Sequence, residues 1–211
     1  MARPGRACHH GLVLTSLLTG YQATGDTEAA DLARMVRLAA ASHDPWSRSL
    51  PLHFTASALV VHPATGRVLL RWHVKLGLWL QVGGHADPRE TDPLQIALRE
   101  AREETGLADL APWPDGRLRH VAVCQVRASG GDPQHEHADL RYVLATDRPD
   151  AIAAENAQSP LRWLSVDEAR ELVGGNNLRR TLDRTELLFE RGSLARWPER
   201  GPHRDRPAWC G

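Results

Sequence analysis

A short amphipathic helix with clearly marked ends constrains this chain most. Asp92 is placed to cap the first free N–H groups, Pro93 suits the first helical position and Gly106 suits a left-handed end. The spacing therefore predicts a helix over residues 93–105. Its buried stripe is expected to consist of Leu94, Ala97, Leu98 and Ala101.

Three carboxylates, those of Glu100, Glu103 and Glu104, are expected to share another face of this helix. Like charges at i, i+4 cost about 0.2–0.5 kcal/mol per pair, and the negative end of the helix dipole adds to the cost. Taken singly, each glutamate fits a solvated surface, with Arg99 pairing to Glu103. The three glutamates together, preceded by the glycine pair Gly83–Gly84, instead indicate a site for a hard divalent cation that prefers oxygen ligands.

The stretch from Gly84 to Leu107 closely resembles the Nudix box, written G-x5-E-x7-R-E-U-x-E-E-x-G-U. The fixed positions are filled by Gly84, Glu90, Arg99, Glu100, Ala101, Glu103, Glu104, Gly106 and Leu107. One spacing departs from the pattern, because eight residues rather than seven separate Glu90 from Arg99. We expect the extra residue around Thr91–Asp92, where a loop absorbs an insertion at little cost.

The resemblance implies an α/β protein with a Nudix-type α/β/α sandwich around a mixed β-sheet. It also implies a metal-dependent hydrolase that cleaves a diphosphate (phosphoanhydride) linkage in a nucleoside diphosphate linked to another moiety, by water attack at phosphorus, with Mg²⁺ or Mn²⁺ as cofactor. The implied metal ligands are Glu100, Glu103, Glu104 and the Gly83 carbonyl, and Glu103 is either a ligand or the base that deprotonates water. Glu90 and Arg99 are expected to brace the loop against the helix through an ion pair.

Members of the family often draw another acidic residue from beyond the box, and Glu155 is the candidate here, although an ordinary loop glutamate is an equal reading. The rival is the run from His135 to Asp139, since strand geometry would put His135, His137 and Asp139 on one face. These side chains could hold a metal or contact a substrate phosphate, with a solvated strand entrance as the alternative.

Basic residues precede the box and are candidate substrate contacts. Arg71 and Lys75 would face the same cleft as the carboxylates and bind substrate phosphates, whereas the plain alternative is an exposed strand edge guarded by charge. Trp72, Trp79 and Tyr142 could stack on a base, but such residues are more typical of a core.

The rest of the chain predicts one domain with additions at both ends. Residues 1–50 read as an N-terminal helical extension and connector, 51–191 as the Nudix domain and 192–211 as a flexible tail. A helix over 26–42, capped by Asp26, lies in the extension. Strands are expected at 54–62, 67–73, 79–84, 120–128, 137–145 and 161–164, and helices at 166–173 and 178–191.

Composition narrows the class of partner. Twenty-six basic and 26 acidic residues balance, which argues against an extended nucleic-acid surface and favours a small-molecule substrate. Three widely spaced cysteines, Cys8, Cys124 and Cys210, argue against a disulfide framework and fit a reducing cytoplasm. No segment is long enough to cross a bilayer. The N-terminal extension is expected to cover the sheet or to mediate a homodimer.

Two other functions stay open. A non-catalytic ligand-binding or regulatory module could use the same fold, although the retained Glu100, Glu103 and Glu104 count against it. A diphosphate isomerase would want a cysteine facing the substrate, and Cys124, in a strand-like run, has no identified partner.

Overall fold

The computed structural model describes residues 14–128, 131 and 133–192. A mixed β-sheet lies at its centre, with the strand order β3-β2-β1-β7-β5, while β4 pairs with β1, β6 with β7 and β8 with β2. The strands are β1 (Leu52–His62), β2 (Arg67–His73), β3 (Leu78–Leu80), β4 (Val82–Gly84), β5 (Ala111–Pro112), β6 (His120–Val126), β7 (His135–Ala145) and β8 (Leu161–Leu164). The β1–β7 pair is parallel, and the other pairs are antiparallel.

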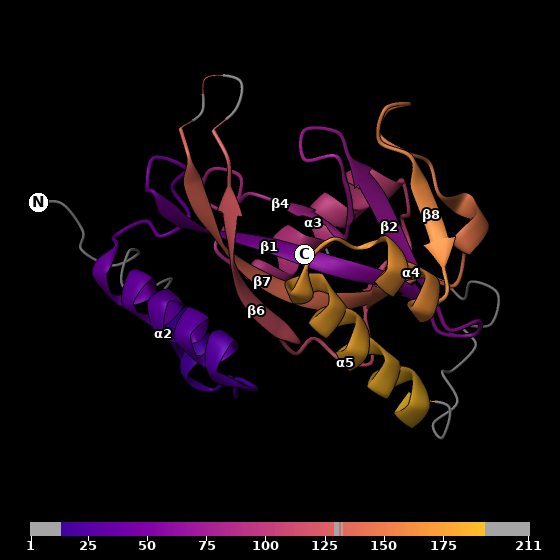
Figure 1. Cartoon of the computed structure of the whole chain (residues 1–211), viewed down its shortest axis with the longest axis horizontal. Helices are drawn as coiled ribbons and strands as arrows, with labels where there is room; N and C mark the ends of the chain where they lie inside the picture. The colour runs from indigo at the N-terminus through magenta and orange to yellow at the C-terminus, as the bar shows by residue number, and fades with distance from the viewer. Residues whose placement is uncertain (1–13, 129–130, 132, 193–211) are drawn as a thin grey trace, which may run out of the picture.

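Helices cover both faces of this sheet. They are α2 (Asp26–Ala41), α3 (Pro93–Thr105), α4 (Val166–Leu172) and α5 (Asn176–Gly192), with a 3₁₀ turn at Pro149–Ala151 and helical residues 14–19. In Figure 1, α4 and α5 cross in front of the sheet and α3 lies behind it. The predicted α/β/α sandwich is therefore confirmed.

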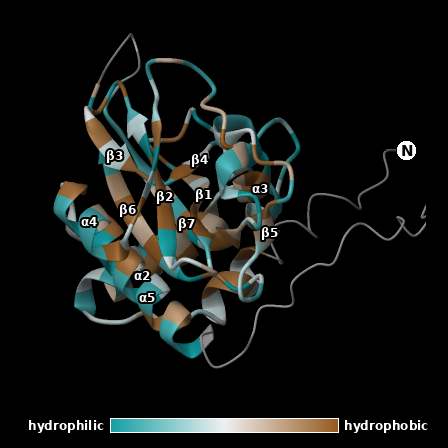
Figure 2. Ribbon diagram, turned by 90° about the vertical axis from the view of Figure 1, so that its right-hand side faces the viewer, coloured by the Kyte–Doolittle hydropathy of each residue, from teal (hydrophilic) through white to brown (hydrophobic). Residues whose placement is uncertain are grey.

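Each face of the sheet has its own hydrophobic core, because successive strand residues point to opposite sides. Phe54 and Leu140 belong to the core beneath α3. Leu59, Val143 and the α5 residue Leu182 belong to the core on the other side. Figure 2 shows the strands mostly hydrophobic and the helices mixed, as expected for a sheet buried on both faces.

Helix α3 begins and ends where the sequence predicts. The Asp92 carboxylate accepts hydrogen bonds from the N–H groups of Leu94 and Gln95, and Gly106 adopts the left-handed conformation with φ 70°. The predicted stripe is only partly right. Leu94 is half-buried, whereas Ile96, outside the stripe, is completely buried, because the helix presents a wider face to the sheet than four positions.

Two further predictions were wrong in detail. Asp26 does not cap α2: Gly25 occupies the N-cap position, and no side chain caps the helix there. The carboxylate of Glu28 instead accepts a hydrogen bond from the Thr24 N–H at 2.8 Å. The predicted strand over 79–84 is interrupted at Gln81, because β3 pairs with β2 whereas β4 pairs with β1. Other element bounds shift by at most two residues.

The helical extension packs against the domain. Asp31 of α2 accepts a hydrogen bond from the Val123 N–H of β6 at 3.0 Å, and Arg34 pairs with Glu136 of β7. The predicted flexible tail lies outside the described residues except for Gly192, as do residues 1–13. Within the described part of the chain, no helix is both long and apolar enough for a membrane span.

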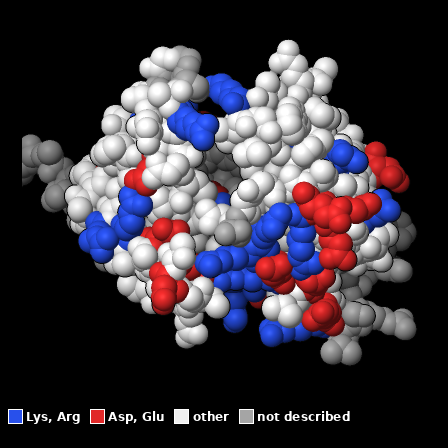
Figure 3. All heavy atoms as spheres, viewed as in Figure 1, with Lys and Arg blue, Asp and Glu red and all other residues white. Residues whose placement is uncertain are grey.

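Charges of both signs are interspersed over α4 and α5, as the space-filling view shows (Figure 3). Arg170 of α4 illustrates the pattern, since it pairs with Asp167, Asp183 and Glu186. On this face, therefore, acidic partners interrupt the basic residues.

Candidate active site

Helix α3 holds two carboxylates against the glycine pair of β4. Glu100 and Glu104 lie one turn apart, and the Gly83 N–H donates a hydrogen bond to Glu104 Oε2 at 3.0 Å. A Cβ at Gly84 would lie 2.7 Å from Glu100 Oε2, and one at Gly83, where φ is 146°, would lie 2.4 Å from the Ser57 Cα. Glycine at both positions is what lets the helix carboxylates come this close to the strand.

Arg99 joins the loop before α3 to the helix. Its guanidinium donates to both oxygens of Glu90, at 3.1 Å from Nε to Oε1 and 2.9 Å from Nη2 to Oε2, and to the His85 carbonyl at 2.8 Å. It also donates to Glu100 and Glu103 at 2.9 and 3.0 Å. The structure thus contains the predicted Glu90–Arg99 ion pair, and the extra residue leaves it intact.

Glu103 differs from its two neighbours on α3. Its side chain is 56% exposed, against 17% for Glu100 and 14% for Glu104. Glu103 therefore lies nearer to solvent than Glu100 and Glu104, although Arg99 Nη1 contacts both Glu100 and Glu103.

Arg71 of β2 connects Glu104 to the predicted loop acid. Its Nη1 lies 3.0 Å from Glu104 Oε1, and its Nη2 lies 2.8 Å from Glu155 Oε2. The buried Nε of Arg71 has no hydrogen-bond partner. The alternative of an exposed strand edge is wrong for Arg71, because its register partners are Leu80 of β3 and Leu161 of β8.

A cavity of about 320 Å³ opens beside this group. It is lined by Arg71, His73, Val74, Lys75, Asn156, Gln158 and Ser159. The structure thus places Lys75, in the turn after β2, on the same cavity as Arg71, while Glu155 directly precedes one of the lining residues. These three predicted residues come together although more than 80 positions separate Arg71 from Glu155.

Burial changes how the carboxylates ionise. It raises the pKa of Glu104 to about 7, although Arg71 and the Gly83 N–H pull the pKa down. Burial also raises the pKa of Glu100 despite its bond to Arg99. In contrast, the hydrogen bonds from Arg99 lower the pKa of Glu90. Keeping Glu100 and Glu104 ionised therefore costs free energy, and a bound cation would offset that cost.

The donor set fits Mg²⁺ or Mn²⁺. Arg71 and Arg99 form ion pairs with six carboxylates, those of Asp87, Glu90, Glu100, Glu103, Glu104 and Glu155. Two guanidinium groups cannot neutralise six carboxylates, and oxygen ligands with excess negative charge are what hard divalent cations select.

Asp139 does not lie at this site. Thr55, Ser57 and Arg141 donate to its carboxylate at 3.1, 2.8 and 2.8 Å. Burial alone would raise its pKa, but the ion pair with Arg141 and the hydrogen bonds outweigh burial and lower it. A carboxylate engaged in this way inside the protein argues against the predicted substrate contact of Asp139.

His137 also lies away from the carboxylates of α3, among other histidines. It does share one face of β7 with His135 and Asp139, as predicted, and its Nε2 lies 3.2 Å from that of His135. His53 and His85 complete this group, and sequence reasoning missed both. Only the alternation at 135 and 137 was visible in the sequence, because His53 and His85 come from other strands and loops.

The aromatic residues and Cys124 do not point to a base-binding or nucleophilic role. Tyr142 is buried, and Trp72 and Trp79 pack edge to face with centroids 5.6 Å apart. The Cys124 thiol accepts a hydrogen bond from Arg141 at 3.3 Å, and burial raises its pKa. A thiol that is harder to ionise than usual is a poor nucleophile, which argues against the isomerase.

Comparison with known proteins supports the motif. A sequence model of the NUDIX domain matches residues 51–185. The chain belongs to the Nudix hydrolase family. The matched range covers the whole sheet and α3, and so includes every residue of the site described above.

Two curated relatives match part of the chain. A CMP-5'-(N-acetyl-N-hydroxy-3-aminopropyl)phosphonate hydrolase from Streptomyces rubellomurinus is 29% identical over 61% of this chain and 62% of its own length. A probable DHNTP pyrophosphohydrolase from Lactococcus lactis subsp. cremoris is 32% identical over 42% of this chain and 50% of its own length. The chain thus spans about half to three fifths of the length of the curated relatives it matches.

Among solved structures, the C. elegans Ap4A hydrolase in a binary complex superimposes with a TM-score of 0.53 at 18% identity, covering 65% of this chain and 97% of that one. At this level of identity, the likeness shows the Nudix fold alone.

Proposed function

We propose that the protein is a metal-dependent hydrolase that cleaves a diphosphate linkage in a nucleoside diphosphate joined to another moiety, by attack of water at phosphorus. The observation that carries the proposal is the convergence of Glu100 and Glu104 on the Gly83–Gly84 backbone, beside the cavity that Arg71 lines. The activities after which the two curated relatives are named, CMP-linked phosphonate hydrolase and probable pyrophosphohydrolase, agree with this class of reaction.

Glu100 and Glu104 would hold Mg²⁺ or Mn²⁺ together with the Gly83 carbonyl, and Glu103 would be either a further ligand or the base that deprotonates water. When bound, such an ion neutralises charge on phosphoryl oxygens and makes water easier to deprotonate. Arg71 and Lys75 would bind the substrate phosphates from the cavity side. Arg99 keeps Glu100 and Glu103 in place through its bonds to both and to Glu90, and is a positioning residue.

Glu103 is the proposed general base, and Glu155 is the alternative. Glu103 is the most exposed carboxylate of α3, so it can reach water. Glu155 also reaches solvent, but its carboxylate is paired with Arg71 at 2.8 Å. Glu103→Gln and Glu155→Gln separate the two roles. Loss of the base lowers kcat by about 10²–10⁴-fold with unchanged Mg²⁺ dependence, whereas loss of a phosphate-side group chiefly raises KM.

The proposal also keeps the domain boundaries predicted from the sequence. Residues 51–191 would form the catalytic domain, with residues 1–50 as an extension, and the homodimer and the reducing cytoplasm stay predictions.

The test is a substrate panel of nucleotide sugars, dinucleotides and nucleoside triphosphates, given to the purified full chain with Mg²⁺, with Mn²⁺ or with EDTA. The reactions are run in ¹⁸O-labelled water, and their products are analysed by mass spectrometry. Turnover that needs metal, disappears in Glu104→Gln and places ¹⁸O on a phosphate product supports hydrolysis at phosphorus. Tight binding of a panel member without product, in wild type and variant alike, would overturn the enzyme in favour of the binding module.

A further inference from the structure

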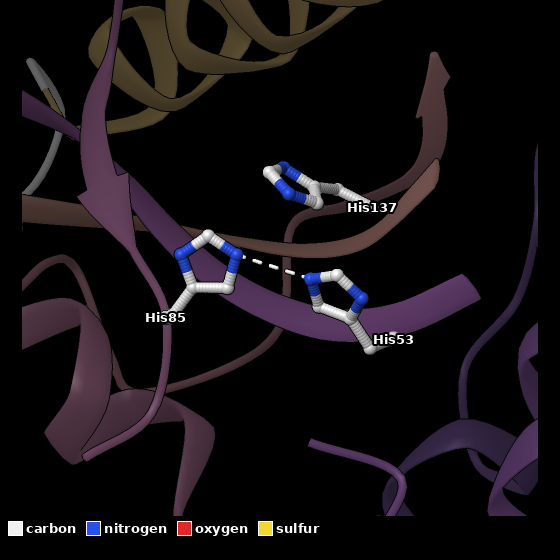
Figure 4. A group of neighbouring side chains, drawn as sticks. All are labelled: His53, His85 and His137. Carbon is white, nitrogen blue, oxygen red and sulfur yellow. Dashed lines mark hydrogen bonds between the residues drawn. The ribbon is translucent and has the colours of Figure 1, made fainter. Parts of the chain in front are cut away.

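Three imidazoles from separate parts of the chain meet on the face of the sheet that lies opposite α3. His53 of β1 and His137 of β7 are register partners in the parallel pair, and His85 follows β4. The Nε2 atoms of His53 and His85 are 3.0 Å apart, and one nitrogen from each of the three rings lies within 4.8 Å of the others. Figure 4 shows the rings of His53 and His85 pointing toward each other, with that of His137 beside them.

Backbone carbonyls fix how the His53 ring and the neighbouring His135 ring present their nitrogens. His53 Nδ1 lies 2.9 Å from the Leu50 carbonyl, and His135 Nδ1 lies 2.8 Å from the Pro133 carbonyl. A carbonyl can only accept, so each Nδ1 carries the hydrogen and each Nε2 presents a lone pair. Imidazoles that ligate metals are oriented in this way by an outer hydrogen bond.

The spacing of the nitrogens suits a transition metal. Zinc–nitrogen bonds of about 2.0–2.1 Å in a tetrahedral site place ligand nitrogens roughly 3.3–3.4 Å apart. The His53–His85 separation of 3.0 Å, and the 4.8 Å limit on the whole group, require only small side-chain movements to reach that value. Neutral imidazoles favour zinc, copper or nickel, whereas magnesium prefers oxygen ligands.

A cavity next to His53 would let an ion reach the three imidazoles. A cavity of about 280 Å³ is lined by Arg48, Ser49, Leu50, Pro51, His53, Pro133, Gln134 and His135. His135 is within 3.2 Å of His137 and so stands next to the three rings as a fourth nitrogen donor. A site of three protein ligands with an approachable side leaves a position for water or a further ligand.

We propose that His53, His85 and His137 form a binding site for a transition-metal ion of the zinc class, separate from the carboxylate site on α3. Without metal, the short Nε2–Nε2 contact is a hydrogen bond in which His85 donates to His53. With metal, the lone pairs of all three rings face the ion, and the hydrogen of His85 moves to its Nδ1.

The experiment uses the full chain, stripped of metal with a chelator. Zn²⁺ binding is measured by competition with a chromophoric chelator, and Co²⁺ replaces Zn²⁺ so that its visible absorption reports the coordination geometry. The variants are His53→Gln, His85→Gln, His137→Gln and the triple variant. His62→Gln is the matched control, because His62 lies on the same strand and is bonded to Thr65 at the opposite end.

We expect one high-affinity equivalent of Zn²⁺, an intense tetrahedral Co²⁺ spectrum, and a loss of affinity of about 100-fold or more in each single variant. His62→Gln and Glu104→Gln should bind as wild type does. A variant with Cys8, His9 and His10 replaced should also retain the site, which excludes binding by these N-terminal donors.

The proposal is overturned if the triple variant, shown to be folded by circular dichroism, still binds Zn²⁺ as wild type does. It is equally overturned if wild type takes up no Zn²⁺, or if Glu104→Gln abolishes uptake while the histidine variants do not. That last pattern would place the ion at the carboxylates.

Discussion

Glu104→Gln should remove a pH-dependent cost from the metal-free protein. The Glu104 side chain is 14% exposed, and burial raises its pKa to about 7. The ordinary glutamate pKa of 4.5 applies in the unfolded chain. Between these two values the folded state holds a proton that the unfolded state has lost, so the free energy of unfolding falls as the pH rises.

The size of the effect follows from the two pKa values. Their difference corresponds to about 3 kcal/mol of stability, which is present below pH 4.5 and is lost once the pH passes 7. Glutamine keeps the shape of the side chain and still accepts the Gly83 hydrogen bond, but it does not titrate. The stability difference between variant and wild type should therefore grow by about 3 kcal/mol between pH 4 and pH 9, in favour of the variant.

Urea unfolding of both proteins in EDTA, at several pH values, measures this difference. Glu103→Gln is the matched control on the same helix, because its side chain is 56% exposed and should change stability by less than about 0.5 kcal/mol. Adding Mg²⁺ at one hundred times its Kd should stabilise wild type by about 2.7 kcal/mol at pH 8 and leave Glu104→Gln unchanged. A difference between wild type and Glu104→Gln that does not vary with pH would refute the reasoning.

Three further predictions follow from particular contacts. Gly84→Ala should weaken Mg²⁺ affinity about 10–100-fold, because its Cβ would displace Glu100; a Mg²⁺ titration like that of wild type would contradict this. Glu28→Gln should cost about 3–5 kcal/mol at pH 7 in urea unfolding, since it leaves Arg184 unpaired. Burial opposes ionisation of Glu28, but hydrogen bonds from Arg184 lower its pKa to about 2, so the stabilisation is complete above pH 4.5 and disappears as the pH falls through 2. Ile96→Ala should cost about 2–5 kcal/mol with unchanged Mg²⁺ affinity, and a loss below 1 kcal/mol would contradict its complete burial.

The sequence predicts α3 well because its signals are local. Asp92, Pro93 and Gly106 each act on backbone groups within a few residues, so their effect does not depend on the rest of the fold. The burial of Leu94 and Ile96 was predicted less well. Which edge of a helical stripe becomes buried depends on how the helix tilts against the sheet, and one sequence does not specify that tilt.

The same distinction holds for the site. Spacing along one helix brings Glu100 and Glu104 together, and the pattern of the box anticipates the Arg99–Glu90 pair. Arg71 and Glu155 meet only because β2 and the loop before β8 are neighbours in the sheet, which the sequence suggests only through resemblance. The burial of Asp139 was missed because two of its partners, Thr55 and Ser57, come from β1, more than 80 positions away in the sequence.

The histidine cluster was the feature hardest to predict from the sequence, and the carboxylate site on α3 was the easiest. The two share the loop between β4 and α3, which contains His85. The His85 carbonyl accepts a hydrogen bond from Arg99 at 2.8 Å, while the His85 ring lies 3.0 Å from that of His53. Arg99 in turn holds Glu100. Any ligand that shifts the His85 ring therefore acts on a residue whose backbone helps to orient Arg99. If such a ligand changes the affinity of the carboxylate site for its metal, that metal must change the affinity for the ligand by the same factor. The loop between β4 and α3 is thus the physical connection through which occupancy of the proposed imidazole site would alter the proposed carboxylate site.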